Sequence, residues 1–562
     1  MSLRQMKKLY KSVAPSIVQI EDSESDEEDS GNSTVCNSFD VLKLSSEPES
    51  EAESDHDFSN EENPDLHEEK KDKKAGTKKN KKKSKTVEQE NPSEIILQDD
   101  IDLAVNEIKK EYGEAGVETT ESDPRRDVRT RNNLFTINRK HIYAKNEELR
   151  FFGPEEDENG RRKKPKETKT VLKNQITSNV GISNVKGIYM TILDSKDGYT
   201  YFVYNHTKEY RQRHEMLLNQ MHHIQPRFGI ELHAESFKNM HVEAMMLSFA
   251  QFCLSDSYDQ ATMVMEHIIC HLQYMAHPFF NITNKQHRLE FKYIENIIFH
   301  VALLQYSHML SRKACHRTAL ELAKVLLNLD PRDPLAVILI IDKFAINAKE
   351  YSWLIDAIDS MAEKDVKYMF NIKYSYALAH YHVAMQNKED LKKADELLKK
   401  ALLLFPSLPK LLIPAREQRD EAVKRLLAHP MYNELASRSI SQPLHELTLL
   451  YAACMQPRWR EPAAMQWFVR NALELMDQYD AEPTIRAKYE HKTNVRQTLF
   501  RLWPAPVARH LCVIKPMANW LVDGAVPEPP FYEFVHVINP VPDSRTVNRY
   551  NYDYPPSFLM SG

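Results

Sequence analysis

The stretch Thr318-Ala-Leu-Glu-Leu-Ala-Lys-Val-Leu-Leu-Asn-Leu-Asp-Pro331 decides the fold of this chain. Its apolar residues recur at helical spacing, and a proline follows the run, as is usual after a helix. A second stretch, Lys393 to Pro406, has the same pattern, and Ala261 to Pro278 is a looser third copy. Aligned on the proline, Ala319 matches Ala394, Leu327 matches Leu402, and Leu329 matches Leu404.

A helix that carries small residues, ends at a proline and opens into another helix is typical of tetratricopeptide-like hairpins, whose period is about 34 residues. Small residues let the two helices of a hairpin approach, and stacked hairpins share one continuous core. The spacing between the prolines is irregular here, so we predict a mostly α-helical, degenerate tetratricopeptide-like α-solenoid over residues 216–503. Its large aromatic residues are expected in the core: Trp353, Tyr374, Tyr376, Tyr381, Trp467 and Phe468.

A β-hairpin is predicted on the N-terminal side of this body, within a connecting segment at residues 131–215. The runs 188–193 and 199–204 are rich in β-branched and aromatic residues, and a turn that contains Gly198 separates them. On the other side, residues 504–562 form a Pro- and Tyr-rich C-terminal tail. Four aromatic residues in it favour a segment docked on the body: Trp520, Phe531, Tyr532 and Phe534.

Residues 1–130 read as a long disordered arm whose charge changes from acidic to basic. Residues 21–69 are acidic, Ser-rich and poor in aromatic residues, so they bury too little apolar surface to offset the entropy of ordering. Ser23 and Ser25 each have an acidic residue three positions later, and both are candidate sites for kinases that read an acidic context. A solvated acidic spacer is the alternative interpretation.

A lysine run follows at residues 70–85. It is either a nuclear-import signal, a contact to ribosomal RNA or another nucleic acid, or a solubilising tract. Lysines without interleaved aromatic residues give salt-sensitive attraction to phosphates but do not read bases. Its candidate contact residues are Lys70, Lys71, Lys73, Lys74, Lys78, Lys79, Lys81, Lys82, Lys83 and Lys85.

Two short apolar islands interrupt the arm and are candidate partner-docking elements. The first contains Phe39 and Leu42. The second, between residues 93 and 112, has near-helical spacing and is expected to form a short amphipathic helix, either docked on the body or used for binding. Its apolar face comprises Ile101, Leu103, Val105 and Ile108.

Cysteine usage and hydropathy predict a soluble protein of the cytosol, with the nucleus as a second location, and no membrane partner. The six cysteines lie far apart and form no C-x-x-C pair, as is typical of reduced, buried thiols. The N-terminus lacks the apolar run of a signal peptide. The longest apolar run, residues 335–341, is far shorter than the ~20 residues that span a bilayer.

No motif in the chain indicates catalysis. Phosphate-binding loops, the zinc-protease motif and the nucleophile elbow are all missing from the sequence. His267 and His271 have a helical spacing that can hold a metal ion, but no Cys pair or matching carboxylate accompanies them in sequence. We therefore expect a binding protein with no catalytic residues, no cofactor and no metal.

Several motifs, in this order along the chain, resemble the family of transcription factor 25 and ribosome-quality-control complex subunit one. In the arm the resemblance rests on residues 37–39, the lysine run and Leu149-Arg-Phe-Phe-Gly153. In the body it rests on Ala276-His-Pro-Phe-Phe280, Arg317-Thr-Ala-Leu-Glu321, residues 327–334, Ile340-Ile-Asp-Lys-Phe344, Leu402-Leu-Leu-Phe-Pro406 and Glu461-Pro-Ala-Ala-Met-Gln-Trp467. Unlike the family, the chain has no Trp between residues 173 and 185.

The resemblance implies a non-catalytic adaptor of ribosome-associated quality control. Its implied partners are the large ribosomal subunit, a Listerin-type E3 ubiquitin ligase, ubiquitin and the valosin-containing AAA ATPase. Together these would ubiquitinate stalled nascent chains and extract them for degradation. The alternative that the family offers is a nuclear transcriptional repressor that binds DNA or chromatin partners through its basic arm.

Overall fold

The computed structural model describes residues 134–152, 187–223, 240–361, 369–433, 440–498, 503–521, 538–540 and 545–554. The chain divides into two units, Met1–Ala115 and Gly116–Gly562, and every described residue belongs to the second unit. The predicted acidic and basic arm, residues 1–130, lies outside the described residues. Among the helices in the described ranges, none is both long and apolar enough to cross a membrane.

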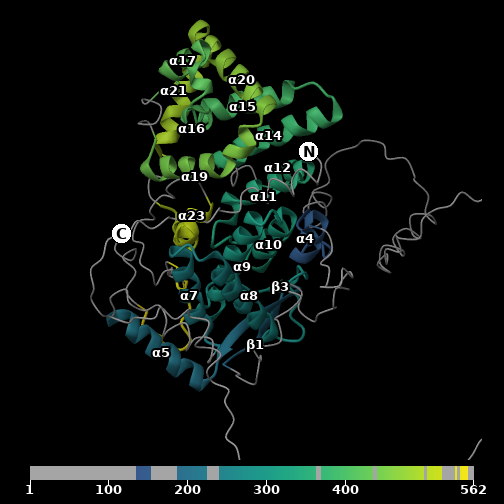
Figure 1. Ribbon diagram of the computed structural model, residues 1–562, viewed down its shortest axis with the longest axis vertical. Helices are drawn as coiled ribbons and strands as arrows, with labels where there is room; N and C mark the ends of the chain where they lie inside the picture. Colours follow the sequence, from purple (N-terminus) through teal and green to yellow (C-terminus); the bar gives the residue numbers. More distant parts are fainter. Residues whose placement is uncertain are drawn as a thin grey trace, which may run out of the picture. The chain divides into compact units, whose positions relative to one another are not determined.

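Paired helices build the first part of the body (Figure 1). In each pair two helices joined by a short connection pack against each other, and each pair also contacts the next pair. This is the solenoid-like packing that the repeated helices predict. The pairs are α7 (Val242–Leu254) with α8 (Tyr258–Tyr274), α9 (Ile294–Arg312) with α10 (His316–Leu329), α11 (Ile341–Ala348) with α12 (Tyr351–Ser360), and α14 (Phe370–Asn387) with α15 (Lys392–Leu404).

The three similar stretches of sequence form the second helix of three of these pairs: α8, α10 and α15. Ala319 of α10 and Ala394 of α15 are both buried, and α10 packs on α9 as α15 packs on α14. The matched alanines therefore occupy equivalent positions inside a hairpin, where a small side chain permits close packing. The prediction of a degenerate helical repeat is confirmed.

The second part of the body is less regular. α19 contacts α11, α14 and α16, while α20 and α21 both contact α15. The described part of the predicted tail then returns to the first pairs, because α22 packs on α9 and the turn after α22 packs on α7. The elements are α16 (Leu408–Leu412), α17 (Glu421–Ala428), α19 (Gln442–Trp459), α20 (Pro462–Ala481), α21 (Pro483–Thr498), α22 (Ala505–Ile514) and α23 (Ala518–Leu521).

A small sheet lies on the N-terminal side of the body (Figure 1). β1 (Ile188–Lys196) and β2 (Tyr199–His206) are antiparallel, and their turn uses Asp197 and Gly198, both with positive φ, which Gly tolerates without a steric penalty. The predicted hairpin is therefore confirmed. A short third strand, β3 (His287–Arg288), adds to β2 in parallel and was not predicted. α5 (Lys208–His223) follows the sheet directly.

The predicted aromatic core is found for four of its six residues. Tyr374, Tyr381, Trp467 and Phe468 are buried, and the Trp467 ring stacks on Tyr381 at 4.4 Å between centroids. Two of the six are only half-buried: Trp353 and Tyr376. Their polar atoms make specific hydrogen bonds instead, from Trp353 Nε1 to a backbone carbonyl and from the Tyr376 hydroxyl to a carboxylate.

Trp520 anchors the return of the C-terminal residues to the body. Its ring packs edge-on against Tyr258 of α8 at 5.1 Å, and its Nε1 donates to Asp256 Oδ1 at 3.1 Å. Arg312, at the end of α9, donates to the Trp520 carbonyl. Buried indole rings need such a partner for their N–H. The described residues 503–521 are thus packed helices that belong to the body.

Candidate functional site

The structure does not describe the binding residues predicted in the arm. This applies to the lysine run from Lys70 to Lys85, to both apolar islands and to the phosphorylation candidates Ser23 and Ser25. Their roles remain predictions.

The predicted spacing of His267 and His271 does occur on one helix, α8. His267 Nδ1 lies 2.7 Å from the Met263 carbonyl, one helical turn earlier, so this nitrogen carries the proton and donates. His271 is buried, and burial lowers its pKa to about 4. Within the described ranges no third His, Cys, Asp or Glu side chain joins this pair in a possible metal-binding group.

The body instead holds two segments of its own chain that have little regular secondary structure. The first is residues 134–138, which lie along α10 and α12. Trp353 Nε1 donates to the Leu134 carbonyl at 2.9 Å, and Asn328 Nδ2 donates to the Phe135 carbonyl at 2.9 Å. Both hydrogen bonds are accepted by main-chain carbonyls of the bound segment, so they do not depend on its side chains.

Two charged residues of α10 extend this set of backbone contacts. Lys324 Nζ donates to the Thr136 carbonyl, and the Asn138 N–H donates to Glu321 Oε2 at 2.8 Å. Lys324 and Glu321 also form an ion pair of 2.7 Å that is almost fully buried. The groove between α10 and α12 therefore holds this segment by its backbone.

The helix that follows the bound segment, α4 (Ala144–Phe152), is fixed by its own contact to α10. Glu147 accepts hydrogen bonds from the backbone N–H groups of Arg317 and Thr318 and from the Thr318 hydroxyl. These N–H groups belong to the first turn of α10, where no intrahelical acceptor exists and a negative charge is favoured. Glu147 is thus a helix cap supplied from a distant part of the sequence.

A cavity of about 480 Å³ lies between residues 134–141 and the helices α10 and α12. Arg317 and Glu350 form an ion pair at its wall, and His141 Nε2 lies 3.2 Å from an Arg317 nitrogen. Burial, together with nearby cations that include Arg317, lowers the pKa of His141 to about 4. The wall thus carries charges of both signs next to the bound peptide segment.

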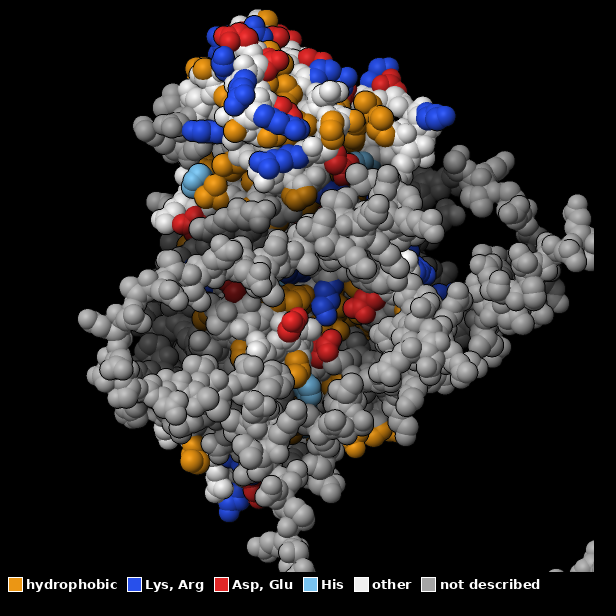
Figure 2. Space-filling model, viewed as in Figure 1, with side chains coloured by type: hydrophobic (Ala, Val, Ile, Leu, Met, Phe, Trp, Pro, Cys, Tyr) orange, Lys and Arg blue, Asp and Glu red, His pale blue; other side chains and the backbone are white. Residues whose placement is uncertain are grey.

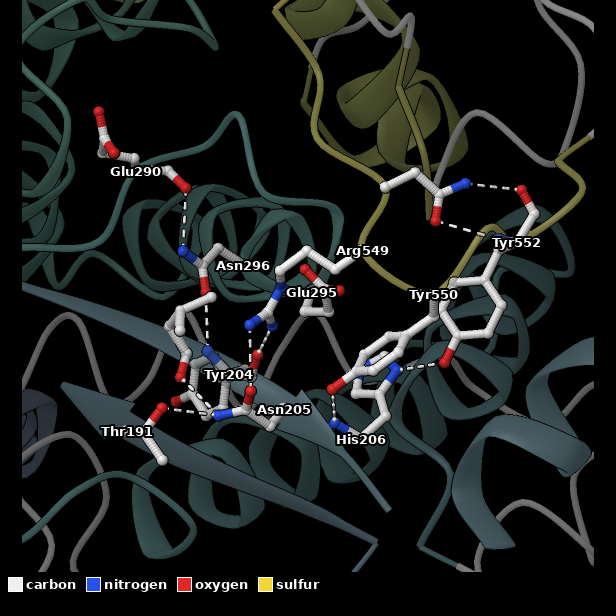
Figure 3. Close-up of polar contacts among 12 residues, drawn as sticks. Thr191, Tyr204, Asn205, His206, Glu290, Glu295, Asn296, Arg549, Tyr550 and Tyr552 are labelled. Carbon is white, nitrogen blue, oxygen red and sulfur yellow. Dashed lines mark hydrogen bonds and ion pairs between the residues drawn. The ribbon is translucent and has the colours of Figure 1, made fainter. Parts of the chain in front are cut away.

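The second segment is residues 545–554, here called the C-terminal strap. Its Val547 pairs with the backbone of residues 292–294, at the start of α9. The next but one residue, Arg549, points into the body, as Figure 3 shows. It donates to Glu295 Oε1 at 3.2 Å, to Asn205 Oδ1 at 3.1 Å and to the Tyr204 carbonyl. One guanidinium therefore ties α9 and β2 to the strap.

The strap tyrosines contact two histidines, His206 at the end of β2, shown in Figure 3, and His214 of α5. The Tyr550 hydroxyl accepts from the His206 N–H, and the Tyr552 hydroxyl lies 2.7 Å from His206 Nδ1. The Tyr554 hydroxyl lies 2.9 Å from His214 Nε2 on α5. Burial, the largest cause, lowers the pKa of His206 well below its usual value, so the ring is neutral when it pairs with these hydroxyls.

Sequence reasoning did not single out Arg549, Glu295 or Glu147. Their partners lie more than 150 positions away along the chain, and such a pair leaves no local pattern. One signal was available for the strap. Tyrosine recurs at 550, 552 and 554, although the segment turns at residues 549–550 and is not a regular strand.

The exposed face of the second part of the body is electrically mixed. Figure 2 shows basic and acidic side chains interspersed over it. Many of them are paired, for example Lys399 with Glu474 at 2.8 Å and Arg425 with Asp477 at 3.0 Å. Binding to a nucleic-acid backbone relies on clustered, unpaired cations. This face therefore lacks the single-sign character of a phosphate-binding surface.

Comparison with known proteins places these features in a family. A family model described as transcriptional repressor TCF25 matches residues 202–519. The human ribosome quality control complex subunit TCF25 is 28% identical over 375 residues, which is 65% of this chain and 54% of the human protein. No solved structure matches the chain.

Two further relatives match shorter stretches of the chain. The ribosome quality control complex subunit 1 of Schizosaccharomyces pombe is 26% identical over 202 residues, 36% of this chain and 28% of that protein. The probable transcription factor claV of Ampulloclitocybe clavipes is 29% identical over 208 residues, 34% of this chain and 26% of that protein. The chain spans about half the length of the human and mouse relatives.

Proposed function

This chain belongs to the TCF25 family, and on that premise we propose that it is a non-catalytic adaptor of ribosome-associated quality control. Several relatives, human and fission-yeast proteins among them, are named as subunits of ribosome quality control complexes. The observation that carries the proposal is that the helical body holds two non-helical segments, residues 134–138 and the C-terminal strap, through hydrogen bonds to their main chain and an ion pair. A scaffold that binds peptide segments in this way is suited to joining partners.

The adaptor would act with a Listerin-type ubiquitin ligase on stalled large ribosomal subunits. It would promote ubiquitination of the nascent chain and its extraction by the valosin-containing AAA ATPase. Its place of action would be the cytosol, with a second population in the nucleus. The lysine run from Lys70 to Lys85 would supply a salt-sensitive contact to ribosomal RNA, because ammonium groups bind phosphates without reading sequence.

An adaptor needs no catalytic residues, and the polar contacts of the body fit that role. Ser311 Oγ lies 3.1 Å from His316 Nδ1, a contact of the kind that activates a nucleophile. In the described residues, however, no carboxylate is hydrogen-bonded to His316. Burial, the largest cause, lowers the pKa of that ring to about 4, which makes it a poor base at neutral pH. We interpret this contact as part of the turn between α9 and α10.

The proposal is tested by sedimentation of lysates in which translation is stalled. The full chain is expected in large-subunit fractions together with the Listerin-type ligase. A variant with the ten lysines of residues 70–85 changed to Gln should leave these fractions at lower salt than the wild type. Absence of the wild-type chain from large-subunit fractions that contain the ligase would refute the adaptor role.

A nuclear transcriptional regulator is the second candidate. The description of the family model and the name of the claV relative favour it. The mixed charges on the exposed face of the second part of the body give it no support, because sequence-selective binding needs base-reading side chains set in a basic surface. A sequence-selective footprint on DNA that survives moderate salt would decide for this candidate.

A further inference from the structure

Three metal-ligating side chains meet beneath the C-terminal strap: His214, His241 and Glu243. His214 comes from α5, whereas His241 is the N-cap of α7 and Glu243 lies in the first turn of that helix. One ligand atom from each lies within 4.8 Å of the other two, and all three side chains are at least nine-tenths buried. No other group of three His, Cys, Asp or Glu side chains gathers in this way in the described part of the chain.

The polar atoms of this cluster are incompletely paired. His214 Nδ1 and His241 Nε2 are buried and have no hydrogen-bond partner. A buried polar atom left without a partner costs about 1–3 kcal/mol. Two such nitrogens next to one buried carboxylate indicate that a group is bound there, because a cation would pair with the carboxylate and accept the free lone pairs.

We propose that His214, His241 and Glu243 bind a divalent transition-metal ion, with zinc as the preferred ion. Two imidazoles and one carboxylate are a ligand set that zinc uses in proteins. Neutral imidazole nitrogens favour zinc over the oxygen-binding cations magnesium and calcium.

The distances in the cluster fit this ion. Glu243 Oε2 lies 3.6 Å from His241 Nδ1 and 3.9 Å from His214 Nδ1. Ligand atoms around a tetrahedral zinc, at bond lengths of about 2.0–2.1 Å, are about 3.3–3.4 Å apart. Each of these two Glu243–histidine distances therefore needs to shorten by only a few tenths of an ångström.

The protonation states also fit. Burial lowers the pKa of His214 to about 3 and that of His241 to about 4. Metal-binding imidazoles must be neutral, and burial favours that form of both rings.

The groups behind the ligands match the usual second layer of a metal site. With His214 Nδ1 on the metal, its Nε2–H donates to the Tyr554 hydroxyl at 2.9 Å. The Tyr210 hydroxyl donates to Glu243 Oε2. His241 supplies either Nε2 or Nδ1, and Nδ1 becomes available when it gives up its 3.2 Å contact with the Ala244 N–H.

The ligands of this site are buried, and the strap covers one of them. The Tyr552 ring lies 4.5 Å from the His214 ring, measured between centroids, and the Tyr554 ring lies 5.7 Å from it. A bound ion would link α5 to the start of α7 and fix the ring that Tyr554 contacts. Metal occupancy and docking of the strap would then stabilise each other.

The test is metal analysis of the full chain, purified without a polyhistidine tag and equilibrated with zinc, followed by gel filtration. We expect about one zinc per chain in the wild type, and the visible absorption of a tetrahedral site after exchange for cobalt. Chelator should lower the melting temperature of the wild type. These measurements need no variant, so a folding defect cannot obscure them.

Two variants and a control assign the ligands. His214→Ala and Glu243→Gln should each lose the zinc and the chelator effect. His271→Ala, which removes a buried histidine of α8 outside the cluster, should keep both. Far less than one zinc per wild-type chain, with no chelator effect, would overturn the proposal, as would full zinc retention in both ligand variants.

Discussion

Replacing Arg549 by Met should detach the C-terminal strap from the body. The guanidinium donates to Glu295, to Asn205 and to the Tyr204 carbonyl, as Figure 3 shows. Methionine keeps most of the apolar stem and removes all of these hydrogen bonds. The Glu295 side chain is fully buried and its Oε2 already lacks a partner, so the substitution leaves a buried carboxylate without a cation.

The free-energy cost of Arg549→Met comes mainly from leaving the Glu295 carboxylate without its cation. Removing one partner of a buried ion pair typically costs about 3–5 kcal/mol. The Arg549 side chain is 25% exposed, and an undocked strap admits water to Glu295, so the lower end of the range applies. About 3 kcal/mol corresponds to an increase of about 10²-fold in local opening.

The loss of stability caused by Arg549→Met should become smaller as the pH falls. Burial, the largest cause, raises the pKa of Glu295 above its usual value even with Arg549 present. Without Arg549 the carboxyl binds a proton more readily in the folded state than in the unfolded state. Its penalty is therefore largest at pH 7 and is relieved as the pH falls through the raised folded pKa.

Hydrogen exchange of the full chain measures this effect at the amides of β2 and of the start of α9. The double variant with Glu295→Gln should recover most of the lost protection, because a neutral amide is cheaper to bury than a charge. Lys400→Met is the control, since its pair with Glu396 is about 70% exposed and should contribute little. Less than threefold faster exchange in the Arg549 variant would show that the guanidinium does not hold the strap.

Three further predictions concern the groove, a buried acid and the core. Asn328→Ala removes the hydrogen bond to the Phe135 carbonyl, worth about 1 kcal/mol, and should speed proteolysis of the bound segment about fivefold. Burial raises the pKa of Asp342 to about 6, so ionisation of this carboxyl destabilises the fold as the pH rises through 6. Asp342→Asn should therefore flatten the dependence of the unfolding free energy on pH between pH 4 and 7, measured by urea titration. Phe468→Ala should cost about 3–5 kcal/mol in urea denaturation, whereas Phe279→Ala, at a ring that is 74% exposed, should stay within about 0.5 kcal/mol.

Each of these has its own contrary outcome. Equal proteolysis rates in the Asn328 variant would mean that residues 134–138 are held by other contacts. An unchanged pH profile for Asp342→Asn would place the titrating group elsewhere, for example at Asp333, whose pKa burial also raises to about 6. Equal losses for the two phenylalanine variants would contradict the burial difference between them.

Local patterns predicted the elements of the fold well. The apolar spacing of Thr318–Pro331 and of its copy predicted helices α10 and α15, because helical periodicity can be recognised within a short stretch of sequence. The turn at Gly198 predicted the hairpin for the same reason. β3 was not predicted. It has only two residues, which form no recognisable pattern in sequence, and it pairs with a strand about 85 positions earlier.

The candidate sites were much harder to predict. The sequence drew attention to His267 and His271 because their spacing is regular, yet the cluster with metal-binding geometry uses His214, His241 and Glu243. These three share no helical spacing, since the first lies 27 positions before the second. Only the packing of α5 beside the start of α7 brings them together.

The sequence by itself determined that this protein is a repeat of helical hairpins with a β-hairpin before it. The sequence also contains no familiar catalytic motif. Helix and turn formation depend on near neighbours, so a single sequence records them. Only the tertiary structure decided which distant residues the body binds. Arg549, for example, donates a hydrogen bond to Asn205, which lies 344 positions earlier in the chain. Contacts of that kind form only when distant segments pack, and their geometry is set by the whole core and not by any local stretch of sequence.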